Sequence, residues 1–193
     1  MKKTFLLLIF CSTITVSFSQ NTKNGFFKGN AFVGGSLGFS SEKDGETKKN
    51  TIDFSPKIGY FITNNLAIGM DLGYGQNKTS TASIVGENKT ILIVGAFGKY
   101  YFNPSNQFSL FGNLGFDYNS TNDLIAKYKT NGFDIGFSPG VSYFLSNNFV
   151  LEASIGKIGF VSTKPDVKEA VSKSTFDFNL NISTITFGLS YKF

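Results

Sequence analysis

The last eight residues of the chain alternate strictly between apolar and polar side chains. The two sets are Phe187, Leu189, Tyr191 and Phe193 against Thr186, Gly188, Ser190 and Lys192. A period of two residues is typical of a β-strand with one apolar and one polar face. In water, an aromatic strand that ends a chain without a polar tail would favour aggregation. A strand with hydrocarbon on one face and a polar interior on the other accounts for both features.

Seven more segments show the same alternation, which predicts eight strands in all. They cover about residues 30–40, 51–61, 66–75, 89–102, 108–118, 131–144 and 149–160, followed by 175–193. The fourth segment begins with an apolar run, and we place Leu92 outward and Lys99 inward. In the last segment the apolar positions change from even to odd numbers, which predicts a bulge near Ser183 and Thr184.

Short turns and long polar segments alternate between these strands. Three connections have three to five residues, whereas four polar segments have ten or more: 41–50, 76–88, 119–130 and 161–174. This alternation is typical of transmembrane β-barrels, which have short turns on one side of the membrane and long loops on the other. Aromatic residues near the short turns predict a girdle at the level of the lipid headgroups. They are Tyr60, Phe61, Tyr100, Tyr101, Phe102, Phe108, Tyr143, Phe144, Phe149, Tyr191 and Phe193. The alternative, an aromatic core between two stacked sheets, does not explain their clustering at one end.

The amino terminus has the pattern of a secretory signal peptide. A basic Met-Lys-Lys start precedes an apolar run at residues 5–11, and Ser17 and Ser19 are small residues at the positions that a signal peptidase reads. We expect cleavage after Ser19, so that residues 1–19 form the signal peptide and residues 20–193 the barrel. The rest of the sequence has no apolar run of the roughly 20 residues that a membrane helix needs.

The composition argues against several kinds of chemistry. The sequence has no histidine, and its one cysteine, Cys11, lies in the predicted signal peptide. The mature chain would therefore lack disulfides, thiol chemistry and a histidine base, and no metal-ligand cluster or phosphate-binding loop is apparent. We expect no enzymatic activity and no cofactor. The 18 basic residues are all lysines scattered among acids, which is not the clustered pattern of nucleic-acid binding.

Charged residues at inward positions predict a polar network inside the barrel. If residues 63–65 form a turn, the register places Lys57 directly opposite Asp71, where the two charges would neutralise each other. An eight-stranded barrel has an interior just wide enough for its own side chains. We therefore predict a plugged lumen that holds Lys57, Asp71, Lys99 and Glu152, the alternative being an open ion pathway. Other inward carboxylates are interpreted as polar groups of the lumen and not as a catalytic pair: Asp53, Asp117 and Asp134.

One hairpin sequence occurs twice, 83 residues apart. Residues 54–66 read FSPKIGYFITNNL, and residues 137–149 read FSPGVSYFLSNNF. The two hairpins lie four predicted strands apart, which is half of the barrel. Similar turn chemistry arising twice is the alternative to a true repeat. The proline in each copy lacks an N–H donor and predicts a bulge or a broken ladder.

Three segments resemble a known family. They are KGNAFVGGSLGFS at residues 28–40, SPKIGYF at 55–61 and GKYYF at 98–102. These segments look like the small outer-membrane β-barrels of Bacteroidota, which are similar in architecture to OmpX and to the membrane domain of OmpA. The resemblance implies the outer membrane of a Gram-negative bacterium, with long loops extracellular and the termini periplasmic. Lys99 stands where related chains often carry Arg, which implies a less forked ion pair.

The final strand also resembles the assembly signal of outer-membrane barrels. Thr186, Gly188, Tyr191 and Phe193 match its defining positions, which implies insertion by the Bam machinery. The sequence thus predicts an all-β fold: an eight-stranded antiparallel up-and-down transmembrane β-barrel after a cleaved signal peptide. The expected role is structural or surface-binding; the alternative is a narrow, porin-like conduit for small or hydrophobic solutes. Membrane lipid and lipopolysaccharide are the expected partners of a monomeric barrel.

Overall fold

Ten strands form the regular structure of residues 25–81, 84–180 and 185–193, the part of the chain that the computed structural model describes. The strands are β1 (Ala31–Asp44), β2 (Thr47–Phe61), β3 (Leu66–Thr81), β4 (Ile84–Tyr101), β5 (Phe108–Asp123), β6 (Tyr128–Phe144), β7 (Phe149–Ile155), β8 (Lys157–Pro165), β9 (Lys173–Asn179) and β10 (Ile185–Lys192). The period-two segments of the sequence form strands because alternate side chains point to opposite faces of a strand. Those described residues include no helix long and apolar enough to cross a membrane.

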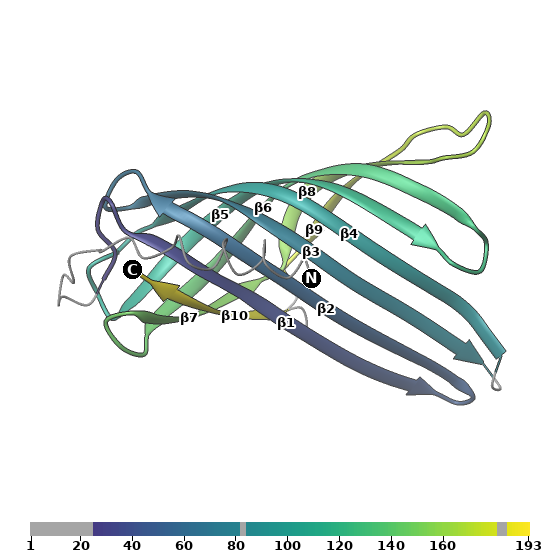
Figure 1. The fold of residues 1–193 in the computed structure, drawn as a ribbon, viewed down its shortest axis with the longest axis horizontal. Helices are drawn as coiled ribbons and strands as arrows, with labels where there is room; N and C mark the ends of the chain where they lie inside the picture. The colour runs from purple at the N-terminus through teal and green to yellow at the C-terminus, as the bar shows by residue number, and fades with distance from the viewer. Residues whose placement is uncertain (1–24, 82–83, 181–184) are drawn as a thin grey trace, which may run out of the picture.

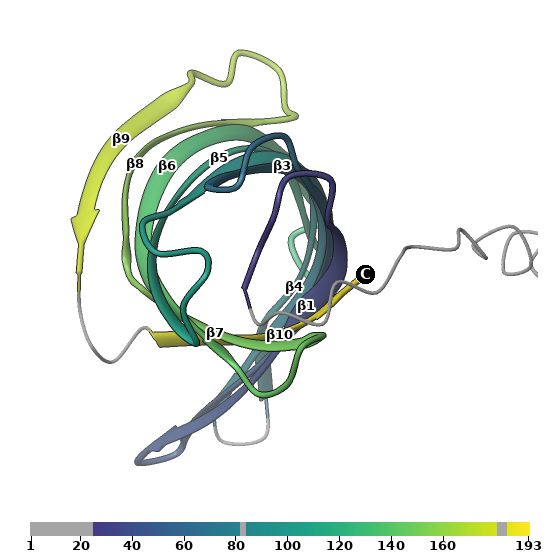
Figure 2. The same cartoon turned by 90° about the vertical axis from the view of Figure 1, so that its left-hand side faces the viewer.

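The strands close into one antiparallel barrel (Figures 1 and 2). Neighbours pair in chain order from β1 to β7, and β10 pairs with both β7 and β1 to complete the ring. β7 and β8 both pair with β6, one after the other, so together they provide one strand of the barrel. β9 pairs with β8, and β10 pairs with β7, so β9 and β10 together provide another. The predicted all-β, eight-stranded antiparallel barrel is confirmed.

The barrel has two different ends. The turns at 62–65, 102–107 and 145–148 lie at the same end as residue 25 and the carboxyl terminus, and we call this the turn end. The hairpins β1–β2, β3–β4, β5–β6 and β8–β9 lie at the other end, which we call the loop end. Figure 1 shows these hairpins extending together at the loop end, on the side opposite the carboxyl terminus.

Apolar side chains face outward around the barrel wall. Leu37 is 80% exposed and Met70 58%, whereas the inward Phe97 is 8% exposed. The predicted facing of the fourth strand is also confirmed, since Leu92 is exposed and Lys99 is buried. An outward apolar surface around a partly polar interior is the reverse of a soluble protein, and it suits a barrel surrounded by hydrocarbon.

The strands run well into the segments that we expected to be loops. β1 and β2 leave only residues 45–46 between them, and β5 and β6 leave 124–127. The prediction of loops was therefore wrong over most of 41–50, 76–88 and 119–130, whereas residues 166–172 of the segment 161–174 do connect two strands. The reason is that polar Ser, Thr, Asn and Lys residues continue the antiparallel ladder where both faces of the sheet are in water, because the backbone hydrogen bonds do not depend on an apolar face.

Both repeated prolines lie where a ladder is interrupted, as their missing donor predicts. The β2–β3 pairing passes from Phe54 to Lys57 and skips Ser55 and Pro56. Pro139 lies where β6 changes partner from β8 to β7, opposite the break at Gly156, which has a φ of 60°. This break divides the predicted seventh strand in two. The bulge predicted near residues 183–184 falls outside the described residues.

The two copies of the repeated hairpin form equivalent turns. The Thr63 hydroxyl oxygen accepts hydrogen bonds from the backbone N–H groups of residues 65 and 66, at 3.2 and 2.9 Å. Ser146 accepts from those of residues 148 and 149 at 3.3 and 3.1 Å. In each turn the last Asn donates its side-chain amide to a carbonyl of a neighbouring strand, Asn65 to Tyr101 and Asn148 to Lys192. The repeat therefore encodes the geometry of the turn.

Candidate functional site

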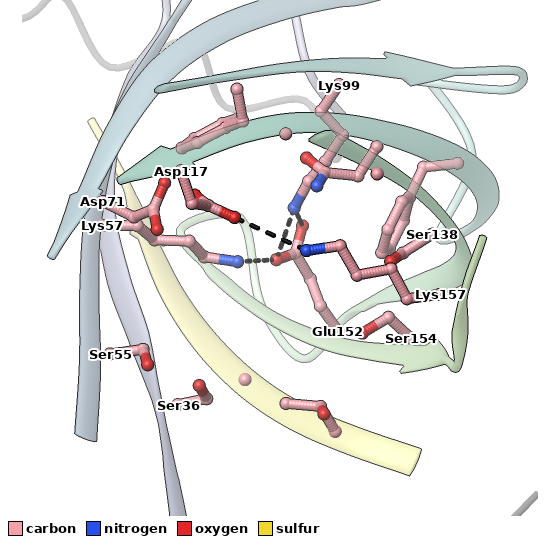
Figure 3. Close-up of a pocket in the computed structure, with 17 residues that line it drawn as sticks. Ser36, Ser55, Lys57, Asp71, Lys99, Asp117, Ser138, Glu152, Ser154 and Lys157 are labelled. Atoms are coloured by element: carbon pink, nitrogen blue, oxygen red, sulfur yellow. Dashed lines mark hydrogen bonds and ion pairs between the residues drawn. The ribbon is translucent and has the colours of Figure 1, made fainter. Parts of the chain in front are cut away.

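The charged centre of the lumen is the carboxylate of Glu152 on β7 (Figure 3). Lys99 on β4 donates to both carboxylate oxygens at 3.0 Å, and the Tyr101 hydroxyl donates to Oε1 at 2.7 Å. Lys57, from β2, also forms an ion pair with Oε2. Glu152 and Lys99 are each 4% exposed. Three donors from two other strands thus satisfy one buried carboxylate, which offsets much of the cost of desolvating these charges.

Aromatic rings surround the charge of Lys99. Its Nζ lies 4.5 Å from the ring centroid of Phe111 and 5.8 Å from those of Phe97 and Tyr101. Ring faces attract a cation through their quadrupole, so these contacts stabilise the ammonium group where water is excluded. The pairing of Lys99 with Glu152 combines two residues that the sequence placed in the lumen without specifying a contact.

The expected pairing of Lys57 with Asp71 differs from the observed contacts. The register does place the two residues directly opposite each other on β2 and β3. However, the Lys57 ammonium forms its ion pair across the lumen with Glu152. The Asp71 carboxylate lies over Gly95, where an added side-chain carbon would meet both Asp71 and Asp117. The prediction considered only the cross-strand neighbour, whereas the narrow barrel lets a long lysine side chain reach the opposite wall.

A row of carboxylates crosses the wall above this centre, toward the loop end. Asp71, Gly95, Asp117 and Asp134 are successive register partners on β3 to β6. Neighbouring like charges repel each other. Lys157 on β8 offsets this repulsion because its Nζ lies 3.5 Å from Asp117 and forms a second ion pair with Asp134. Lys157 was not among the predicted lumen residues, because the one-residue break at Gly156 changes which positions face inward.

The turn end of the lumen is filled by aromatic side chains and by the segment that precedes β1. Phe26 is 2% exposed, and its ring centroid lies 4.4 Å from that of Phe61, 4.5 Å from Tyr101 and 4.8 Å from Phe144. Phe61, Tyr101 and Phe144 were assigned to the headgroup girdle, and this part of the assignment was wrong. They occupy inward positions next to outward aromatic residues, so strand parity separates the two sets; Tyr60 and Tyr100 are exposed.

Hydrogen bonds hold this segment in the barrel mouth. The N–H of Phe26 donates to the carbonyl of Pro104 at 2.7 Å, and Lys192 Nζ donates to the carbonyl of Gly25 at 2.7 Å. Gly25 has a φ of 113°, and a side-chain carbon there would lie 2.7 Å from Pro104 and from Ser105. Only glycine fits this close approach. The adjacent Phe26 and Phe27 ahead of the first strand were the sequence signal for a docked segment.

Between the charged centre and the loop end lies a cavity of about 210 Å³. Its polar lining includes Ser36, Ser55, Lys57, Asp71, Asn113, Asp117, Ser138, Glu152, Ser154, Lys157 and Thr186. Thr186 and Gly188 of the predicted assembly signal thus line the lumen. Tyr191 faces outward, and its ring centroid lies 5.1 Å from that of Phe149 and 5.0 Å from that of Phe193. The backbone N–H of Phe193 donates to Ala31 at 2.9 Å.

The chemistry that this lumen offers is ion pairing and hydrogen bonding. Within residues 25–81, 84–180 and 185–193, no group of three or more His, Cys, Asp or Glu side chains could hold a metal ion. Each strongly buried charge already has a partner, and Glu152 accepts from three groups. A nucleophile paired with a base is not among the hydrogen bonds of the described lumen residues.

Comparison with known proteins places this barrel in a family. The sequence pattern of the outer membrane protein beta-barrel domain matches residues 5–193. The fold is similar to that of OprG from Pseudomonas aeruginosa, with a TM-score of 0.57 and 14% identity over 89% of this chain and 99% of that one. It is also similar to outer membrane protein W of E. coli, with a TM-score of 0.52 and 14% identity over 86% and 99% of the two chains.

At these identities the solved structures bear on the fold alone. No curated protein matches the sequence. The family match covers nearly the whole chain, and the closed barrel with its outward apolar surface agrees with it. The chain belongs to the outer membrane protein beta-barrel domain family.

Proposed function

We propose that this protein is an integral barrel of the Gram-negative outer membrane whose lumen is closed by its own side chains and which has a structural or surface-binding role, without enzymatic activity. In this proposal the loop end is extracellular and the turn end periplasmic. The hairpins at the loop end then form the surface available to partners outside the cell.

The observation that carries the proposal is the double closure of the lumen. Phe26 and the inward aromatic rings fill the turn end, and the ion pairs of Glu152 with Lys57 and Lys99 cross the lumen above them. Water and ions would have to displace both layers to pass. The cavity beyond them would be a blind vestibule that faces the loop end.

Single-channel recording of purified protein in planar bilayers tests the closure. We expect no steady conductance from the wild-type barrel. A barrel that lacks residues 25–30 and carries Glu152→Ala provides the opened control, and it should show discrete conductance steps. Steady open conductance from the wild-type protein would refute the closed lumen.

A conduit for hydrophobic solutes is the second candidate, and one observation favours it. β1 pairs with β10 only from Phe32 to Ser36, and within the described residues its outer part, from Leu37 to Asp44, pairs with β2 alone. β9 in turn pairs with β8 alone. Figure 2 shows β9 standing apart from β1. Backbone N–H and C=O groups without a partner are costly in hydrocarbon, so the strands at this edge would be held together less firmly than elsewhere in the wall. A hydrophobic solute would therefore pass between the lumen and the membrane at this edge.

Uptake assays separate the two candidates. Cells that lack the protein should take up hydrophobic solutes normally if the barrel is a scaffold, and slowly if it is a conduit. Shortening the β1–β2 and β3–β4 hairpins should abolish binding of cells to surfaces, without a change in permeability, only if the scaffold proposal is correct.

We also propose how the barrel matures. Residues 1–19 would be removed as a signal peptide, and the Bam machinery would insert residues 20–193 through the signal at Tyr191 and Phe193. Amino-terminal sequencing of the protein from outer membranes should give Gln20 as the first residue. A monomer in mild detergent is the expected form.

A further inference from the structure

The charged side chains of the strands are segregated between the two faces of the barrel wall. Lys57 points into the lumen, and register partners on neighbouring strands point to the same face of the wall. Because side chains alternate along each strand, the registers show which strand residues face inward and which face outward. Every strand Asp and Glu whose side chain is described falls on the inward face, including those at the loop end such as Asp44, Glu87 and Asp123. The charged residues at outward strand positions are all lysines, and all are exposed: Lys43, Lys48, Lys78, Lys129 and Lys164.

Three of these lysines form a cluster, which we call the lysine triad. Lys43 on β1 and Lys48 on β2 are direct cross-strand partners. Lys48 lies opposite Ser80 on β3, two residues from Lys78, so Lys78 is its diagonal neighbour. Direct and diagonal neighbours on one face have Cβ atoms about 5 and about 7 Å apart. Like charges placed directly opposite each other destabilise a sheet, so this arrangement calls for an anion.

The triad lacks a carboxylate partner. Among the described side chains, no Asp or Glu lies within 4.0 Å of these three ammonium groups. The other outward pair, Lys129 and Lys164, also forms no ion pair at this distance, but Asp166 follows β8 at the register position opposite Lys129. No register partner of the triad lysines is an Asp or Glu. The triad is therefore the stronger candidate for binding an anion from outside the protein.

All three lysines stand at the same height above the apolar surface. On each strand, the outward positions toward the loop end are first an apolar residue, then a polar one, then the lysine. They are Phe39, Ser41 and Lys43 on β1, Ile52, Asn50 and Lys48 on β2, and Tyr74, Gln76 and Lys78 on β3. Each lysine is thus two outward positions beyond the last apolar side chain. Four residues span roughly 13 Å along a strand, or about 10 Å along the membrane normal at a tilt of about 40°. The headgroup region adds about 5–7 Å on each side of the hydrocarbon core, so the long, flexible lysine side chains reach back from these strand positions to the lipid phosphates.

We propose that the lysine triad binds the phosphate groups of a phosphorylated glycolipid of the outer leaflet, such as the lipid A part of lipopolysaccharide. The acyl chains of this lipid would lie against Phe39, Ile52 and Tyr74 below the triad. A lipid supplies the apolar and the anionic parts of this surface at the required spacing, whereas a free phosphate ion supplies only the charge. The proposal rests on the orientation proposed above, with the loop end outside.

Lipid binding to the purified full-length mature protein in neutral detergent micelles tests the proposal. Native mass spectrometry would measure the bound fraction of bisphosphorylated lipid A and of the same lipid after removal of its phosphates. The test variant is Lys43→Gln, Lys48→Gln and Lys78→Gln together. The matched control removes the same charge from other exposed lysines, through Lys49→Gln, Lys168→Gln and Lys173→Gln. Heat-dependent gel migration would verify that each variant is a folded barrel.

A lysine beside an anionic surface contributes about fivefold to affinity, so loss of three should weaken binding of bisphosphorylated lipid A on the order of a hundredfold. The control variant should bind within about threefold of wild type, and dephosphorylated lipid should bind wild type as weakly as phosphorylated lipid binds the test variant. Added salt should reduce the difference, because it screens exposed charges.

Two results would overturn the proposal. One is equal affinity of the wild type and the folded test variant for bisphosphorylated lipid A. The other is full competition by inorganic phosphate at millimolar concentration, which would assign the triad to a free anion. Because this assay uses micelles, its failure leaves the proposed orientation intact. Labelling of a Glu46→Cys variant on whole cells tests that orientation separately, since Glu46 is exposed in the turn between β1 and β2.

Discussion

Replacing Glu152 by Gln removes the charge that pairs with both Lys57 and Lys99. The substitution keeps the shape of the side chain but leaves two ammonium groups in the lumen without a counter-ion at hydrogen-bonding distance. Lys99 is almost fully buried among aromatic rings, so water cannot replace the lost carboxylate. Breaking a buried ion pair by removing one partner typically costs about 3–5 kcal/mol. We expect E152Q to lower the free energy of unfolding by about that amount.

Related substitutions show whether charge or packing is responsible. Lys99→Met leaves Glu152 with Lys57 and Tyr101, so the expected loss is smaller, about 1–3 kcal/mol. Replacing the whole network with apolar groups of similar size, through Lys57→Met, Lys99→Met, Tyr101→Phe and Glu152→Leu, should cost about 1 kcal/mol or less, because no charge is left unpaired.

Unfolding in urea, with the barrel in lipid vesicles and gel migration as the readout, measures these values. Asp53→Asn is the matched control, since Asp53 is an exposed inward carboxylate without an ion pair among the described residues; its effect should stay within about 0.5 kcal/mol. If the free energy of unfolding of E152Q lies within about 1 kcal/mol of the wild-type value, the network is not what holds the opposite walls together.

Two substitutions and one deletion test other contacts of the barrel. Phe26→Ala removes the ring that packs on Phe61, Tyr101 and Phe144, so the docked segment should lose about 3–5 kcal/mol. The ion pairs of Glu152 still close the lumen of this variant, so brief conductance steps should appear in bilayer recordings when Phe26→Ala is combined with Glu152→Ala, but not when the exposed control Phe102→Ala is. Unchanged recordings from the combined variant would contradict the role of Phe26. Gly69→Ala should lower the free energy of unfolding in urea by about 1–3 kcal/mol, because the added carbon meets the Ile58 carbonyl and the Phe97 ring. Gly98→Ala on the neighbouring strand is the control; its added carbon meets nothing within 4 Å, so it should be neutral or slightly stabilising. Equal effects of the two substitutions would argue against this packing. Deletion of Phe193 removes a backbone hydrogen bond to Ala31 and the last position of the assembly signal. The fraction of protein inserted into the membrane in a pulse-chase experiment should therefore fall several-fold. Normal insertion would count against that signal.

Part of the candidate site was predictable from strand parity alone. Parity placed Lys57, Lys99 and Glu152 in the lumen, and the turn at residues 63–65 predicted the register of Lys57 with Asp71. Parity cannot identify contacts across the lumen, because these depend on how far the opposite walls are apart. It also failed for Lys157, because one extra residue at Gly156 exchanges the two faces of the strand.

The sequence by itself determined the class of fold and the facing of most strands. Alternation of apolar and polar residues is a local property of a strand, and a barrel in hydrocarbon requires its outward face to be apolar along its whole length. Only the tertiary structure decided which charges meet in the lumen, that Phe26 enters the turn end, and that Lys43, Lys48 and Lys78 share one outer face. These contacts join residues far apart in the chain, and they follow from strand register and barrel closure, which no single segment encodes.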